Sequence, residues 1–123
     1  MKLCVDEYLL DRGLSTSLIK MFLKVSKMSK VLGTSLSASG FEYVIDHFLD
    51  GSGTAGYDIK LVNQALRMDR SQLLAIAIAE GDDPICLDLR SGSVILLLIE
   101  DGEQVQLAST LDEFASIIVS IGN

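Results

Sequence analysis

The sequence predicts an α+β fold, with an antiparallel or mixed sheet flanked by helices. Three observations support this class. Apolar residues make up 49% of the 123 residues, the N-terminal third has helical apolar spacing, and the second half alternates short apolar segments with turn sequences. A chain of this length commonly forms one domain, so we expect a single domain over residues 1–123.

Two helices are predicted in the first third. Residues 5–12 read as a short helix that ends at Gly13. Residues 15–17 supply Ser and Thr as N-caps for a second helix, whose apolar residues recur with helical spacing. Its lysines fall together on the opposite face, which we interpret as the solvated side of a core-packing helix: Lys20, Lys24 and Lys27.

The middle of the chain is less regular. Composition predicts a loop over residues 33–40. Residues 41–49 fit either a helix or a strand, and their aromatic and β-branched content favours a strand. The glycines of residues 51–56 predict a loop that lacks the Gly-Lys-Ser/Thr of a phosphate-binding loop. Asp58 is then expected to cap a helix that runs to Arg67.

Four strands are predicted in the second half: Leu73–Ala79, Ile85–Leu89, Val94–Ile99 and Gln104–Ala108. Their short connections predict an antiparallel meander. The third of these strands has no polar alternation, which indicates a central strand covered on both faces. Thr110 and Glu113 predict a capping box for a last helix with this buried stripe: Leu111, Phe114, Ile117, Ile118 and Ile121.

No catalytic, cofactor or metal site emerges from the residue pattern. The one histidine, His47, follows Asp46 but has no second His or Cys nearby, so we expect a structural or surface role. The acidic residues 80–83 read as a tight turn, because no spaced set of oxygen ligands follows them. Cys4 and Cys86 are expected to be thiols in a reducing cytoplasm. We therefore expect a protein that is not an enzyme.

Charge is distributed unevenly along the chain. Residues 80–123 hold one arginine and nine acidic residues, whereas residues 1–40 are net basic. Phosphate backbones would be repelled by the acidic half, which argues against nucleic acid as the ligand and is compatible with a basic protein partner. The longest apolar runs are far shorter than a membrane span and the N-terminus turns acidic at Asp6, so we expect a cytoplasmic protein without a membrane partner.

A set of residues in the second half follows the order and spacing of a known family: the apolar strand 73–77, the sequence Gly81-Asp82-Asp83-Pro84-Ile85-Cys86-Leu87-Asp88-Leu89, and the later Leu107-Ala108 and Leu111-Asp112-Glu113-Phe114. In these residues the chain resembles the SUKH superfamily, most of whose bacterial members are immunity proteins. The N-terminal part is similar more weakly, since Ser15 stands where the family has proline and Ser26-Lys27 where it has Asn-Gly. The resemblance implies an α+β domain that binds and neutralises a cognate polymorphic or contact-dependent toxin.

We therefore expect a non-catalytic toxin inhibitor. The alternative is a general interaction or scaffold module, for which the apolar excess of the chain suggests homo-oligomers. In a meander, the first and third turns fall at the same end of the sheet, so their acidic residues would cluster and attract a basic partner. The residues expected to bind the partner are Glu80, Asp82, Asp83, Asp88, Glu100, Asp101 and Glu103.

Overall fold

A computed structural model describes residues 5–28, 34–38, 41–68, 71–79 and 81–114 of the chain. In these residues, six strands form one sheet in sequence order, and each strand pairs antiparallel with the next. The α+β class is thus confirmed, with an antiparallel rather than a mixed sheet. The elements are α1 (Val5–Asp11), α2 (Thr16–Met28), β1 (Thr34–Ala38), β2 (Phe41–Phe48), α3 (Ile59–Ala65), β3 (Leu73–Ala79), β4 (Pro84–Asp88), β5 (Val94–Leu98) and β6 (Glu103–Ala108).

The predicted loop over residues 33–40 was wrong for residues 34–38. Residues 34–38 form strand β1 and not a loop, paired with β2 from Thr34 opposite Ile45 to Ala38 opposite Phe41. The Ser-rich composition that suggests a loop is overridden by pairing with a neighbouring strand, because strand propensity depends strongly on tertiary context. The sequence of residues 41–49 fitted either a helix or a strand. In the structure, residues 41–48 form strand β2.

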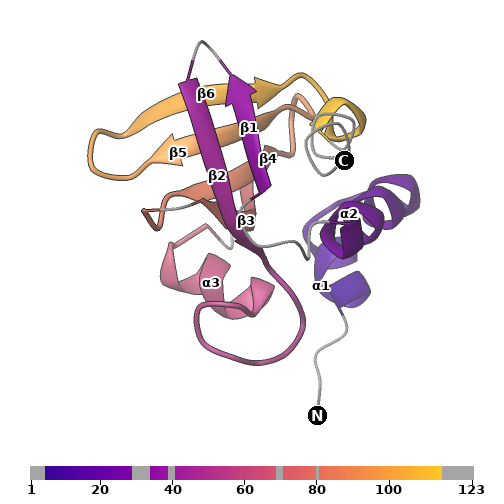
Figure 1. The fold of residues 1–123 in the computed structure, drawn as a ribbon. Helices are drawn as coiled ribbons and strands as arrows, with labels where there is room; N and C mark the ends of the chain where they lie inside the picture. Colours follow the sequence, from indigo (N-terminus) through magenta and orange to yellow (C-terminus); the bar gives the residue numbers. More distant parts are fainter. Residues whose placement is uncertain (1–4, 29–33, 39–40, 69–70, 80, 115–123) are drawn as a thin grey trace.

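The sheet is strongly curled. Its pairing register shifts once between β2 and β3, once between β3 and β4, and once between β5 and β6. Each shift inserts one extra residue into one strand, and such bulges bend a strand and increase its twist. As a result β1 comes back close to β6 without pairing with it, and the β1–β2 hairpin crosses the sheet in Figure 1.

The core lies between the sheet and its helices. Strand β3 is buried from Leu74 to Ala79, so both of its faces are covered. Helices α1 and α2 lie together on one side of the sheet and α3 lies elsewhere, below β3 in Figure 1. The largest side chains that are almost fully enclosed come from the three helices, from strands β3 to β5, and from the residues that follow β2 and β6: Phe22, Phe114, Leu9, Leu49, Ile59, Leu74, Ile76, Ile85, Leu87 and Leu96.

The C-terminal predictions are confirmed in part: β5 ends at Leu98 and not at Ile99, and its last two residues are half-buried. Strand β5 is buried at Val94, Ile95 and Leu96, and β4 and β6 flank it. The N–H of Glu113 donates to Oγ1 of Thr110 at 3.1 Å, so Thr110 caps the helical turn that holds the buried Leu111 and Phe114. The expected stripe residues Ile117, Ile118 and Ile121 lie outside the described residues. No helix in the described ranges combines the length and the apolarity that crossing a membrane requires.

A buried amide joins α3 to the sheet. Asn63 is 0% exposed, and its Oδ1 accepts from the N–H of Ala75 at 2.8 Å while its Nδ2 donates to the carbonyl oxygen of Ala75 at 3.0 Å. Nδ2 also donates to the carbonyl oxygen of Ile59 at 2.8 Å. The pairing of β2 with β3 ends with Phe48 opposite Ala77. Beyond that point, at Ala75, the Asn63 amide forms the hydrogen bonds to the β3 backbone that a neighbouring strand would otherwise form.

Candidate functional site

The β3–β4 turn and the β5–β6 turn, which were predicted to lie at the same end of the sheet, are in contact. Asp83 precedes β4 and Ile99 follows β5, and Oδ1 of Asp83 accepts from the N–H of Ile99 at 3.2 Å. Both the β3–β4 turn and the β5–β6 turn therefore lie at one end of the sheet, at the left in Figure 1. We call this surface the acidic end, and its described members are Asp82, Asp83, Glu100, Asp101 and Glu103. Glu80 lies outside the described residues.

Asp88 is not part of the acidic end. It closes β4, whose first residue, Pro84, is at the acidic end, so Asp88 lies at the opposite end of the sheet. Its Oδ1 accepts from the N–H groups of Arg90 at 2.9 Å and of Ser91 at 3.4 Å. Asp88 thereby shapes the β4–β5 turn, which is a common role for aspartate in turns. The prediction that Asp88 clusters with the acidic turns was therefore wrong.

The members of the acidic end have different local roles. Asp82 adopts a left-handed backbone with φ 68°, a conformation that Asp and Asn tolerate better than most residues. Asp83 is half-buried and holds the two turns together. Glu100, Asp101 and Glu103 are exposed, as is Asp82, so their charges are available to a partner.

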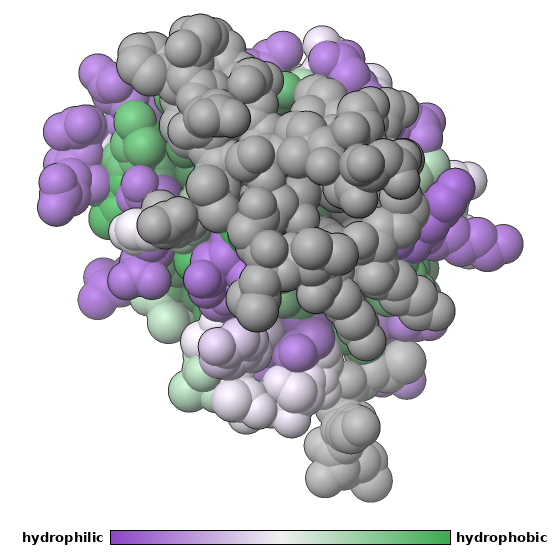
Figure 2. All heavy atoms as spheres, in the orientation of Figure 1, coloured by the Kyte–Doolittle hydropathy of each residue, from purple (hydrophilic) through white to green (hydrophobic). Residues whose placement is uncertain are grey.

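An exposed apolar side chain lies among these charges. Ile99 is 48% exposed and directly precedes Glu100 and Asp101. In Figure 2, hydrophobic atoms at the left, where the β5–β6 turn lies, are bordered by hydrophilic ones. Sequence reasoning assigned Ile99 to a buried strand, but β5 ends at Leu98. An apolar centre with a polar rim is the usual arrangement of a protein-binding surface.

A second feature surrounds His47 on strand β2. Nδ1 of His47 lies 2.6 Å from Oδ2 of Asp46, and Nε2 lies 2.8 Å from the carbonyl oxygen of Gly56. Neighbouring side chains on a regular strand point to opposite faces. The register shift between Ile45 and His47 places an extra residue here, and this bulge lets adjacent side chains meet.

The histidine ties strand β2 to the glycine loop. Asp46 lies beside it on β2 and Gly56 lies in the loop, so the ring bridges the two segments. The ring also packs against Tyr57, with ring centroids 4.3 Å apart. With both nitrogens engaged, His47 holds the loop against β2.

The loop itself is fixed by Asp58. This carboxylate is 2% exposed, and its oxygens accept from the N–H of Gly53 at 2.9 Å and of Leu61 at 3.1 Å. The second bond is the N-cap of α3, as predicted. Asp58 thus sets the position of both the loop and the helix, which form two sides of the neighbouring pocket.

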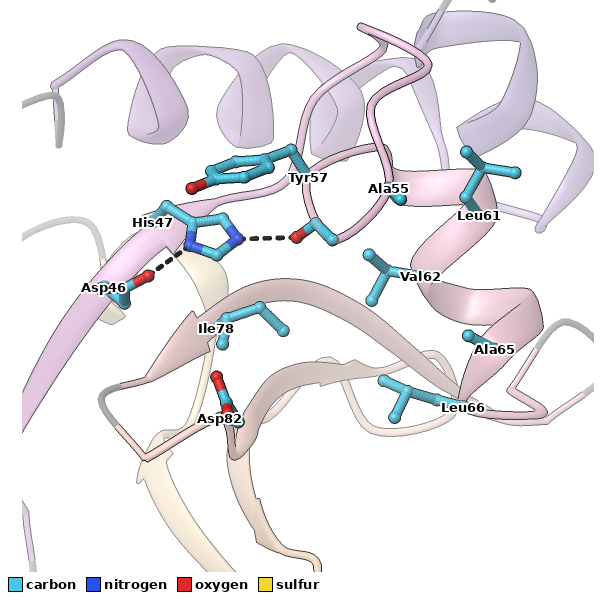
Figure 3. A pocket seen from close by; sticks show the side chains of 11 residues that line it. Asp46, His47, Ala55, Tyr57, Leu61, Val62, Ala65, Leu66, Ile78 and Asp82 are labelled. Carbon is cyan, nitrogen blue, oxygen red and sulfur yellow. Dashed lines mark hydrogen bonds and ion pairs between the residues drawn. The ribbon is translucent and has the colours of Figure 1, made fainter.

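The pocket has a volume of about 440 Å³. Figure 3 shows His47 and Tyr57 beside the loop, Asp46 on β2 on the other side of the His47 ring, and Asp82 beside Ile78. The opposite wall consists of α3 and the residue after it: Leu61, Val62, Ala65 and Leu66. Asp82 belongs to both surfaces, so the pocket adjoins the acidic end. The pocket could not be predicted from spacing along the chain, because its walls come from separate segments.

Two further observations concern chemistry. No group of three or more His, Cys, Asp or Glu residues in the described part of the chain could hold a metal ion. The thiol of Cys86 is fully buried in β4 and lies 3.9 Å from Sδ of Met68. Burial raises its pKa from 9.0 to about 12, because the thiolate would lose its solvation there. Cys4 lies outside the described residues.

No family model matches the chain, and comparisons with curated proteins and with solved structures find no match. The resemblance to the SUKH superfamily therefore stays a prediction that rests on the residues quoted above.

Proposed function

We propose that this chain is a non-catalytic binding domain that neutralises a basic toxin protein through its acidic end. The observation that carries the proposal is the Asp83–Ile99 contact, which joins two acidic turns around an exposed isoleucine. Like charges held together repel one another, and a basic partner would relieve that repulsion. The SUKH resemblance supplies the class of partner, a toxin of the polymorphic or contact-dependent kind.

The geometry suggests how such a surface would act. Charges on the rim speed up encounter and exclude wrong partners, whereas a desolvated apolar anchor slows dissociation. In the acidic end, Glu100, Asp101 and Glu103 would supply the first effect and Ile99 the second. Asp83 would keep the two turns in register, so it acts on the shape of the surface rather than on the partner.

The scaffold alternative has weaker support. It needs a broad apolar surface for a second copy. The exposed large apolar side chains among the described residues are Leu10, Tyr57, Leu61 and Ile99. They come from three separate parts of the chain, and apolar residues scattered singly on a surface are normal.

Charge reversal tests the proposed surface. In a variant with Glu100→Lys, Asp101→Lys and Glu103→Lys, we expect the association rate with the toxin to fall by about 10-fold or more at low salt, because electrostatic steering accounts for roughly 10- to 1000-fold. At high salt, the two rates should converge. Stopped-flow fluorescence measures both.

The matched control changes the net charge equally at a distant place. Asp6, Glu7 and Asp11 are exposed on α1, and their replacement by lysine adds the same charge. If the control slows association as much as the first variant, net charge rather than the acidic end governs binding. Equal low-salt rates for the acidic-end variant and the wild type would rule out this surface.

A further inference from the structure

The pocket beside the acidic end has walls of opposite character. Its volume of about 440 Å³ lies in the range of pockets that bind ligands, roughly 300–1,000 Å³. The α3 wall is apolar, and the wall formed by β2 and the loop carries a carboxylate, an imidazole ring and a phenol ring. A matching ligand would therefore have an apolar stem and a polar, flat head.

The charges around the pocket favour a cation. Asp46 and Asp82 line it, and no lysine or arginine does. Ile45 pairs with Ala79, and the N–H of Asp82 donates to the carbonyl oxygen of Ala79 at 3.1 Å. Asp46 and Asp82 therefore both lie near Ala79, at the C-terminal end of β3. His47 engages only Oδ2 of Asp46, and a carboxylate has a second oxygen that can accept.

The mouth of the pocket is apolar and exposed. Tyr57 is 47% exposed and Leu61 is 41% exposed, and both line the pocket. Exposed aromatic and aliphatic side chains around a pocket that adjoins a charged rim are typical of an anchor site for one side chain of a protein partner. Covering this mouth would remove two of the large apolar side chains from water.

We propose that the pocket binds an arginine side chain of the partner protein. The inference rests on the proposed function, since it names the residue by which a basic partner is anchored. The aliphatic stem of arginine would lie along Leu61 and Leu66, as such stems do on apolar surfaces. Its planar guanidinium would donate to Asp82 and Asp46, which line the pocket on the side opposite α3. A lysine ammonium lacks the paired donors of this planar group.

Small probes test this without the toxin. The amide spectrum of the isotope-labelled full chain is followed by NMR while N-acetyl-arginine N-methylamide is added, and then while the citrulline analogue is added. The two probes have nearly the same shape, but citrulline has no charge. We expect the arginine probe to shift the amide signals of Tyr57, Leu61 and Leu66 and to bind at least about 5-fold more tightly than the citrulline probe.

Two variants with equal charge changes locate the effect. Asp82→Asn removes a pocket charge and keeps a residue that tolerates the left-handed backbone, so we expect arginine binding to weaken at least about 5-fold. Glu103→Gln removes the same charge from the acidic end outside the pocket lining, and binding should stay within about 2-fold of the wild type. The spectra themselves report whether each variant is folded.

The outcomes are distinct. Equal binding of the two probes, no binding at all, shifts that map outside the pocket, or equal effects of Asp82→Asn and Glu103→Gln would each overturn the arginine site. Because no toxin is present, the arginine site can fail while the proposed toxin binding stands. Conversely, the pocket can bind the arginine probe in a chain that recognises no toxin.

Discussion

Replacing Asn63 by leucine is expected to lower the free energy of unfolding by about 3–5 kcal/mol. Leucine is similar in size but can neither donate nor accept, so the N–H and carbonyl of Ala75 lose their partner. Each buried backbone group left without a partner costs about 1–3 kcal/mol, and the carbonyl of Ile59 loses a bond as well. Because small domains have a total stability of only about 5–15 kcal/mol, the loss is large.

Urea denaturation followed by circular dichroism measures the change. The matched control is Gln64→Leu, the next residue on α3, which is exposed and should alter stability by less than about 0.5 kcal/mol. A loss below about 1 kcal/mol for Asn63→Leu would mean that the amide is not what joins α3 to the end of β3.

Cys86 is expected to be almost unreactive in the folded protein. The thiolate is the reacting form, and a pKa of about 12 instead of 9.0 leaves on the order of 1000-fold less thiolate near neutral pH. In a Cys4→Ser background, a thiol reagent should therefore label the native chain only through unfolding. Labelling in urea should be fast. Native labelling at the urea rate would contradict the buried thiol.

The same burial makes stability depend on alkaline pH. The folded pKa of Cys86 lies above the unfolded value, so its contribution is complete below about pH 9 and declines as the pH rises towards 12. The expected slope approaches about 1.4 kcal/mol per pH unit. The comparison is with Cys86→Ala, which lacks this decline and keeps every other ionisable group. Parallel stability curves for the two proteins would exclude the effect.

Local signals in the sequence predicted the elements with strong periodicity and explicit caps. Strand β3 has the predicted bounds, and the predicted caps Asp58 and Thr110 both accept the expected hydrogen bonds. Strand β1 was missed because Ser, Thr and Gly in a short segment are typical of loops, and only its pairing with β2 makes it a strand.

The candidate site was predictable only in part, for a related reason. Alternation of turns in a meander placed Asp83 and Glu100 at one end, but Asp88 was grouped with them although it ends β4 at the other side. The pocket depends on a bulge at Asp46, on a loop folded by Asp58 and on the position of α3. None of these can be located from spacing along the chain.

Growth rescue tests the central claim most directly. A toxin encoded beside this chain is expressed in bacteria together with the wild-type chain or with the variant Glu100→Lys, Asp101→Lys and Glu103→Lys, at equal protein levels. The account predicts that the wild type restores growth and co-purifies with the toxin, and that the variant restores growth poorly. Growth arrest with the wild type and no co-purification, or full rescue by the variant, would contradict it.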